Sequence, residues 1–164
     1  MNIENIIKKI VNECIENYLI EELQPNGNEL SSFLENLPSD ENWGDEIYGA
    51  LNGNEETIRL NLIDNGYCIT VCMIVGWQFC ETDIGNKIEF YLLDDGGTSY
   101  HCFVKYNNKF YDAYNYKGVS KLSDLQFCKI YMNNYSNDYL NSHLKFISRG
   151  EFDDAKADKL IWHY

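Results

Sequence analysis

Residues 101–119 constrain the fold of this chain more than any other stretch, because their pattern predicts a β-hairpin. Runs rich in β-branched and aromatic residues flank a polar centre, and the two central residues, Asn107 and Asn108, are typical of a two-residue turn. Such a turn sets the register of the two strands. The facing pairs are then Tyr106 with Lys109, Phe103 with Asp112, and His101 with Tyr114.

Two polar side chains of this hairpin, His101 and Asp112, are predicted to lie on the same face. Side chains alternate between the two faces of a strand, so both project to one side, together with Phe103. They are diagonal neighbours across the strand pair, within hydrogen-bonding reach in a normally twisted ribbon. An imidazole oriented by a carboxylate supplies two of the three members of a nucleophilic triad, so we expect a nucleophile elsewhere in the chain.

The apolar run at residues 67–80 is compatible with two structures. Its Val, Ile and Thr side chains favour a strand, and Asp64, Asn65 and Gly66 in front of it could close a hairpin turn. The run spans about 14 residues with almost no polar position, which is long for a strand. A helix buried on all sides has this composition, with Asp64 or Asn65 as its N-cap. We favour the helix.

Cys68 is the candidate nucleophile, because a helix over residues 67–80 places it in the first turn. There the helix dipole and the unpaired N–H groups favour a thiolate. The backbone N–H of Cys68, with the side chain of Asn65 or Asn61, could form an oxyanion hole. The alternative is that Cys68 is one more buried core cysteine.

The hairpin also carries a resemblance to a known family. The pattern His-x-x-Val, a polar turn and then Tyr-Asp-Ala, at residues 101–113, resembles the His/Asp cassette of small papain-like and transglutaminase-like cysteine enzymes of bacteria and phages. In that family a cysteine at the start of a buried helix precedes such a hairpin, in the order Cys, His, Asp. The likeness covers residues 64–119. The chain lacks the Gln and the Cys-Trp pair found around the nucleophile in papain, and its short Cys68 to His101 separation favours the compact layout.

The resemblance implies a thiol-dependent acyl transfer, either hydrolysis of a peptide or amide bond or a transamidation. Cys68 would attack the carbonyl, and His101 would take the thiol proton and return it to the leaving amine. Asp112 would orient the imidazole and stabilise its charged form. The expected partner is a peptide or protein substrate, and no cofactor is expected.

The remaining segments complete a prediction of one α+β domain, in which a buried central helix packs on an antiparallel sheet of about four strands with helices around it. Residues 1–63 are expected to form a helical layer, residues 64–132 the core helix and sheet, and residues 133–164 C-terminal helices. The predicted strands are residues 87–93, 98–106, 109–115 and 126–132, and the predicted helices include a first one after Asn2, one at residues 136–146 and a last acidic one from Glu151. His143 and His163 fall in the late helices without a carboxylate arranged beside them, so surface or packing roles are expected for both.

The charge of the chain limits its partners. Thirteen basic and 26 acidic residues leave a net charge of −13. Direct binding of nucleic acid through its phosphates needs Lys and Arg, so it is not expected. The same charge permits a second function, a non-catalytic acidic binding protein or phage or mobile-element inhibitor that imitates a nucleic acid and occupies the basic site of a partner. Carboxylates clustered on one face would favour this alternative, and an open groove at Cys68 would favour catalysis.

The six cysteines contain no Cys-x-x-Cys pair, and they predict reduced thiols in a protein of the cytoplasm or one delivered to a host cytoplasm. A metal site built from Cys68, Cys72, His101 and Cys102 is unfavourable, because His101 and Cys102 are adjacent in a strand and point to opposite faces. No metal is therefore expected. The N-terminus lacks a signal-peptide pattern and no apolar run approaches the ~20 residues of a membrane span, so we expect a soluble protein without membrane contact.

Overall fold

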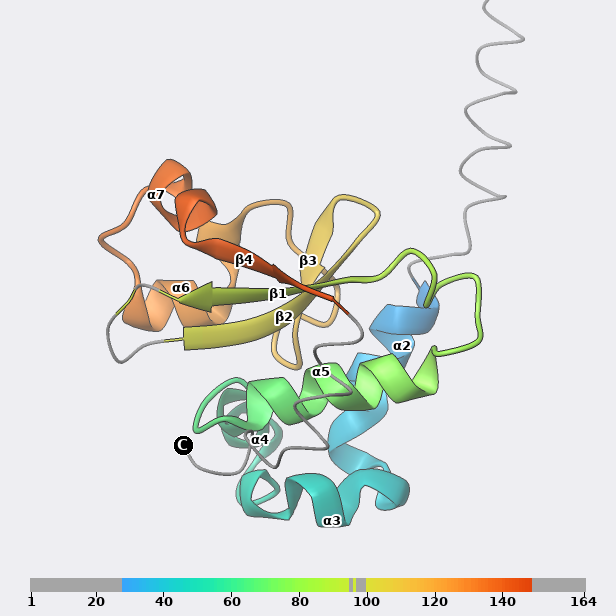
Figure 1. The fold of residues 1–164 in the computed structure, drawn as a ribbon. Helices are drawn as coiled ribbons and strands as arrows, with labels where there is room; N and C mark the ends of the chain where they lie inside the picture. The colour runs from blue at the N-terminus through green and yellow to red at the C-terminus, as the bar shows by residue number, and fades with distance from the viewer. Residues whose placement is uncertain (1–27, 95, 97–99, 149–164) are drawn as a thin grey trace, which may run out of the picture.

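The computed structural model describes residues 28–94, 96 and 100–148 (Figure 1). Over these residues the chain is a single α+β domain, which confirms the predicted fold class. The helices are α2 (Asn28–Asn36), α3 (Gly44–Ile47), α4 (Glu55–Leu62), α5 (Tyr67–Gln78), α6 (Gln126–Tyr131) and α7 (Asn137–Ser142). The strands are β1 (Glu89–Asp94), β2 (Tyr100–Tyr106), β3 (Lys109–Tyr111) and β4 (Leu144–Ile147), in the order β3-β2-β1-β4 across an antiparallel sheet. The predicted first helix and last acidic helix lie outside the described residues.

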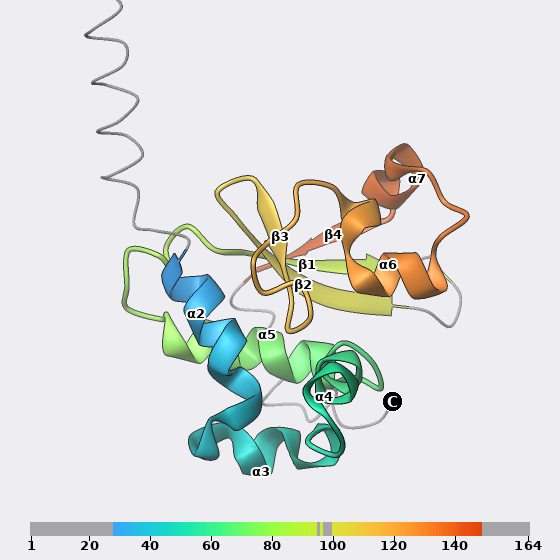
Figure 2. The same ribbon diagram turned by 180° about the vertical axis from the view of Figure 1, so that it is seen from behind.

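Helix α5 is formed by the apolar run, which confirms the helix over the strand alternative. Burial explains its composition, since Val71, Cys72, Ile74 and Val75 are each at most 3% exposed. The helix lies against one face of the sheet and packs on β2, while α2, α3 and α4 gather on its other side (Figures 1 and 2). The face that carries Ile69, Met73 and Trp77 is only half-buried, so α5 is not buried on every side as the composition suggested.

The turn in front of α5 differs from the predicted one. Neither Asp64 nor Asn65 caps the helix, because the N-cap is Gly66 with a φ of 83°, a left-handed conformation that glycine adopts without strain. Asn65 also has a positive φ of 51°, and the turn sets α4 and α5 at 88° to each other. No side chain caps α5, so none blocks the N–H groups of its first turn.

The hairpin of β2 and β3 has the predicted turn. Asn107 and Asn108 adopt φ angles of 47° and 58°, as a two-residue type I′ turn requires, and Tyr106 pairs with Lys109. The second strand is shorter than predicted, because β3 ends at Tyr111. His101 and Tyr114 therefore do not pair across the hairpin, and His101 pairs with Leu93 of β1 instead.

The predicted strand at residues 126–132 is wrong, since these residues form helix α6. The alternation of Cys128, Ile130 and Met132 suggested a strand, but Ile130 is 42% exposed and so does not belong to a buried strand face. The fourth strand is β4, which pairs with β1. It falls partly within the helix predicted for residues 136–146, which ends at Ser142.

The helical layer over residues 28–63 agrees with the prediction. Asp40 accepts a hydrogen bond from the backbone N–H of Asn42, and Asn54 accepts one from that of Thr57, so both cap the helices that follow them. Along the described part of the chain, no single helix is long and apolar enough to cross a membrane, and α4 with α5 would meet that length only as a sharply bent pair.

Candidate active site

The structure brings His101 and Asp112 together. Nε2 of His101 donates a hydrogen bond to Oδ2 of Asp112 at 2.9 Å, and the two residues are 0% and 4% exposed. The contact does not arise from strand pairing, because Asp112 is the first residue after β3. The chain turns away from the sheet at this point, and the turn carries the carboxylate to the ring.

Asp112 is held in place through its other oxygen. Oδ1 accepts hydrogen bonds from the backbone N–H groups of Tyr114 at 3.0 Å and Asn115 at 2.6 Å. Such a side-chain turn competes with the strand ladder and explains why β3 stops at Tyr111. The Asn115 side chain in turn accepts a hydrogen bond from the backbone N–H of Gln126 at 2.8 Å, which ties this turn to the start of α6.

Arg59 supports the same turn from the helical layer. Its guanidinium group donates to the carbonyl of Ala113 at 2.6 Å and to that of Glu35 at 2.7 Å, and it lies over the ring of Tyr116 at 4.4 Å. The residue is only 5% exposed. Sequence reasoning missed both Arg59 and Asn115. The signal for Asn115 was its position three residues after an aspartate, the spacing of a side-chain turn.

Cys68 lies beside this pair, as predicted. It is in the first turn of α5, one residue after Tyr67, and is 3% exposed. Burial on its own lowers the pKa of His101, but the hydrogen bond to Asp112 and the neighbouring Cys68 side chain raise it to about 9. Since Nε2 is taken by Asp112, Nδ1 is the ring nitrogen left for the thiol, and this buried atom has no hydrogen-bond partner of ordinary geometry among the described residues.

The plane of the His101 ring is fixed by aromatic stacking. Phe127 of α6 stacks on it with ring centroids 4.5 Å apart and planes 13° apart, and Phe103 stacks at 5.7 Å and 29°. These contacts fix the plane of the imidazole, which is fully buried from solvent. Phe127 was missed because residues 126–132 were predicted as a strand.

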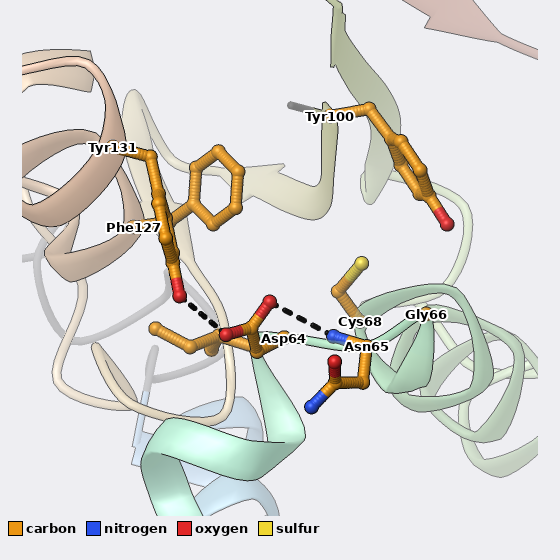
Figure 3. A pocket seen from close by; sticks show the side chains of 8 residues that line it. Asp64, Asn65, Gly66, Cys68, Tyr100, Phe127 and Tyr131 are labelled. Atoms are coloured by element: carbon orange, nitrogen blue, oxygen red, sulfur yellow. Dashed lines mark hydrogen bonds between the residues drawn. The ribbon is translucent and has the colours of Figure 1, made fainter. Parts of the chain in front are cut away.

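A pocket of about 220 Å³ opens at Cys68 (Figure 3). Its lining residues are Ile63, Asp64, Asn65, Gly66, Cys68, Tyr100, Phe127 and Tyr131. The sulfur points into the space between Phe127 and Tyr131 on one side and Tyr100 on the other (Figure 3). A buried nucleophile therefore has a path to a bound molecule.

Asp64 and Tyr131 meet at the rim of this pocket. The hydroxyl of Tyr131 donates a hydrogen bond to Oδ2 of Asp64, and the backbone N–H of Asn65 donates to Oδ1 at 2.9 Å. The hydrogen bond to the carboxylate raises the pKa of Tyr131, because an ionised phenol could not donate it.

The two predicted amide donors of the oxyanion hole lie in different places. Asn65 lines the pocket, although its amide points away from the sulfur of Cys68 (Figure 3). Asn61 does not line it, and its Nδ2 donates to the carbonyl of Ala50 at 3.2 Å. The backbone N–H of Cys68 lies in the first helical turn, where no intrahelical acceptor is available to it.

Three other described cysteines, Cys72, Cys102 and Cys128, lie near the site but do not line the pocket. Burial raises the pKa of Cys72 well above its usual range, with Cys102 as the next largest cause. Burial also raises the pKa of Cys128 to about 12. Neither thiol is therefore a nucleophile at neutral pH. Within residues 28–148, as far as they are described, no group of three or more His, Cys, Asp or Glu side chains could hold a metal ion.

The second described histidine, His143, is remote from this cluster. Its Nδ1 lies 2.9 Å from the carbonyl of Tyr139, and its ring stacks on that of the same tyrosine at 4.0 Å. These contacts match the packing role predicted for it, and His163 lies outside the described residues.

Comparison with known proteins does not identify the site, since no family model, no curated protein and no solved structure matches the chain.

Proposed function

We propose that this protein catalyses thiol-dependent acyl transfer, either hydrolysis of a peptide or amide bond or a transamidation. One observation carries the proposal, namely a buried His101–Asp112 pair whose second ring nitrogen is left for a cysteine at the start of a buried helix. Neither feature alone indicates catalysis, because core cysteines and buried ion pairs are both common. Their contact at the foot of a pocket supports it.

The proposed steps follow from the positions of the three side chains. Cys68 attacks the substrate carbonyl carbon as a thiolate, and the backbone N–H at the start of α5 stabilises the negative charge on the carbonyl oxygen. His101 has a pKa of about 9, so at neutral pH both of its ring nitrogens are protonated. This imidazolium is the counter-ion for the thiolate and the acid that protonates the leaving amine. Water or a second amine then attacks the thioester, with His101 taking its proton.

Asp112 keeps the imidazole in the required state. Its carboxylate accepts a hydrogen bond from Nε2–H, which selects the tautomer that leaves Nδ1 free to receive the thiol proton. This division of roles supports placing the chain with the papain-like and transglutaminase-like cysteine enzymes of the compact type. The substrate we propose is a peptide or protein, in the cytoplasm of the producing cell or of a host, where the described cysteines, none of them in a disulfide, would stay reduced.

The test uses an activated acyl donor, because it requires no knowledge of the substrate. p-Nitrophenyl acetate loses p-nitrophenolate to a reactive thiolate and leaves a thioester, which peptide mapping can locate. We expect acetylation of Cys68 well ahead of the exposed Cys80, and loss of this preference in His101→Gln. Cys80→Ala is the matched control and should behave like the unmodified protein.

Acetylation of Cys68 no faster than of Cys80 would contradict the proposal. The acidic binding protein then becomes the better hypothesis, and it makes the opposite prediction. Under that hypothesis Cys68→Ala keeps all biological activity, while reversing clustered acidic charges abolishes it and binding to a basic partner weakens steeply with salt.

A further inference from the structure

The pocket at Cys68 has a chemical character that the proposed reaction does not explain. Among the described residues that line it, Asp64 is the only one with a carboxylate, and none is a lysine or an arginine. In the described part of the chain, no basic side chain forms an ion pair with Asp64. Within the described residues, the carboxylate at the mouth of the proposed acyl-transfer site therefore has no basic side chain that compensates its charge.

The groups that contact Asp64 orient its carboxylate but do not neutralise it. The Tyr131 hydroxyl and the Asn65 backbone N–H each donate to one of its two oxygens. Each carboxylate oxygen can accept a second hydrogen bond, so both keep an acceptor site. Asp64 is half-buried, which reduces the screening of its charge by solvent.

The walls of the pocket suit the alkyl stem and head of a cation. Phe127 and Tyr131 form one wall, with ring centroids 4.9 Å apart, and Tyr100 stands opposite (Figure 3). Aromatic faces attract ammonium and guanidinium groups and also pack against methylene chains. The volume of about 220 Å³ admits an extended side chain beside the reacting carbonyl and is too small for a folded partner.

We propose that the substrate carries a cationic aliphatic side chain, of the lysine or arginine type, next to the carbonyl that Cys68 attacks. Asp64 binds the charged head, and the rings of Phe127, Tyr131 and Tyr100 enclose the stem. The net charge of −13 attracts such a substrate over a longer range. This assignment rests on the proposed function for its chemistry, but the charge preference of the pocket can be measured without any turnover.

The first test measures the rate at which Cys68 reacts with methanethiosulfonates whose transferred groups are cationic, neutral or anionic. The reagents are the trimethylammonioethyl, methyl and sulfonatoethyl compounds, in which the thiolate displaces methanesulfinate to form a mixed disulfide. Exposed Cys80 serves as the internal standard for the net charge of the whole chain. We expect the ratio of the reaction rate with the cationic reagent to that with the anionic reagent to be about tenfold larger at Cys68 than at Cys80.

Asp64→Asn should abolish this excess, and Asp138→Asn, at an exposed position in the first turn of α7, should leave it unchanged. Tyr131→Phe removes the orienting hydrogen bond but keeps the ring, so part of the excess should remain. Equal charge ratios at Cys68 and Cys80 would overturn the inference. A slow but charge-selective Cys68 would contradict the proposed function and leave the inference standing.

A second experiment decides where in the reaction the cation lies. Blocked lysyl, norleucyl and glutamyl coumarin amides present the charge on the acyl donor, and we expect cleavage of the lysyl compound to be fastest and to need Asp64. The opposite result is equal cleavage rates for the three amides together with faster breakdown of the thioester when a diamine is added. That result would overturn the assignment to the donor and place the cation on the acceptor amine.

Discussion

Replacing Asp112 by Asn tests the central contact of the site. In the native protein Oδ1 of Asp112 accepts hydrogen bonds from two backbone N–H groups, and Oδ2 accepts one from Nε2–H of His101. An asparagine can keep the first two hydrogen bonds through its own oxygen. Its NH₂ group then faces Nε2, and two donors cannot share a hydrogen bond. The ring must move its proton to Nδ1, the atom that has to receive the thiol proton.

The magnitude follows from the pKa of His101. Burial lowers this pKa, but the causes that raise it bring it from an ordinary value near 6.5 to about 9, and the hydrogen bond to Asp112 is the largest of them. Loss of the carboxylate removes the largest cause that raises the pKa, so a smaller fraction of His101 is imidazolium at neutral pH. The comparable change in a serine triad lowers kcat by about 10⁴-fold. We expect about 10²-fold here, because a thiol ionises more readily than a hydroxyl.

The assay is the second-order rate of iodoacetamide labelling at Cys68 across neutral pH, with peptide mapping to separate it from the other cysteines. His101→Gln should be at least as slow as Asp112→Asn, and the double variant little slower than His101→Gln alone, since the pair acts as one unit. Asp138→Asn is a surface control. Losses that multiply in the double variant, or an Asp112→Asn protein that labels at the native rate, would refute the triad.

Three further predictions concern stability and ring placement. The pKa of His101 is raised in the folded state, so its contribution to the free energy of unfolding is complete below about pH 6.5 and is lost as the pH rises through 9. Urea unfolding across this pH range should show the free energy of unfolding fall by on the order of 3 kcal/mol, and His101→Gln should lack this fall. Arg59→Ala should lower the free energy of unfolding by about 3 kcal/mol or more, because buried backbone carbonyls lose their donor, whereas Glu55→Gln, at its exposed ion-pair partner, should change it little. Phe127→Leu removes the ring stacked on the imidazole, and we expect about tenfold slower labelling of Cys68 with a folded protein by circular dichroism.

The features of the fold that follow from neighbouring residues could be predicted from the sequence. Two asparagines between β-favouring runs specify the type I′ turn, and the unbroken apolar run specifies a largely buried helix. Asp40 and Asn54 cap their helices through atoms only a few residues away. Local interactions of this kind need no knowledge of the rest of the chain.

The chemical identity of the site could also be predicted, although its geometry could not. Cys68, His101 and Asp112 were the expected triad residues, and the structure places them together. The expected route, a diagonal contact across a long hairpin, is absent because Asp112 bonds to the backbone of its own turn. That choice depends on Asn115 joining α6 and on Arg59 holding Ala113, both of which are contacts with distant segments.

The sequence by itself determined which residues are the candidates for a reactive site and which turn and helix carry them. Only the tertiary structure decided that residues 126–131 are a helix, that Phe127 covers the imidazole, and that Asp64 faces the thiol across a pocket. The physical reason is that a short amphipathic segment has no strong local preference, so burial against other elements selects its conformation. The pocket, likewise, is a property of surfaces that meet and not of any one segment.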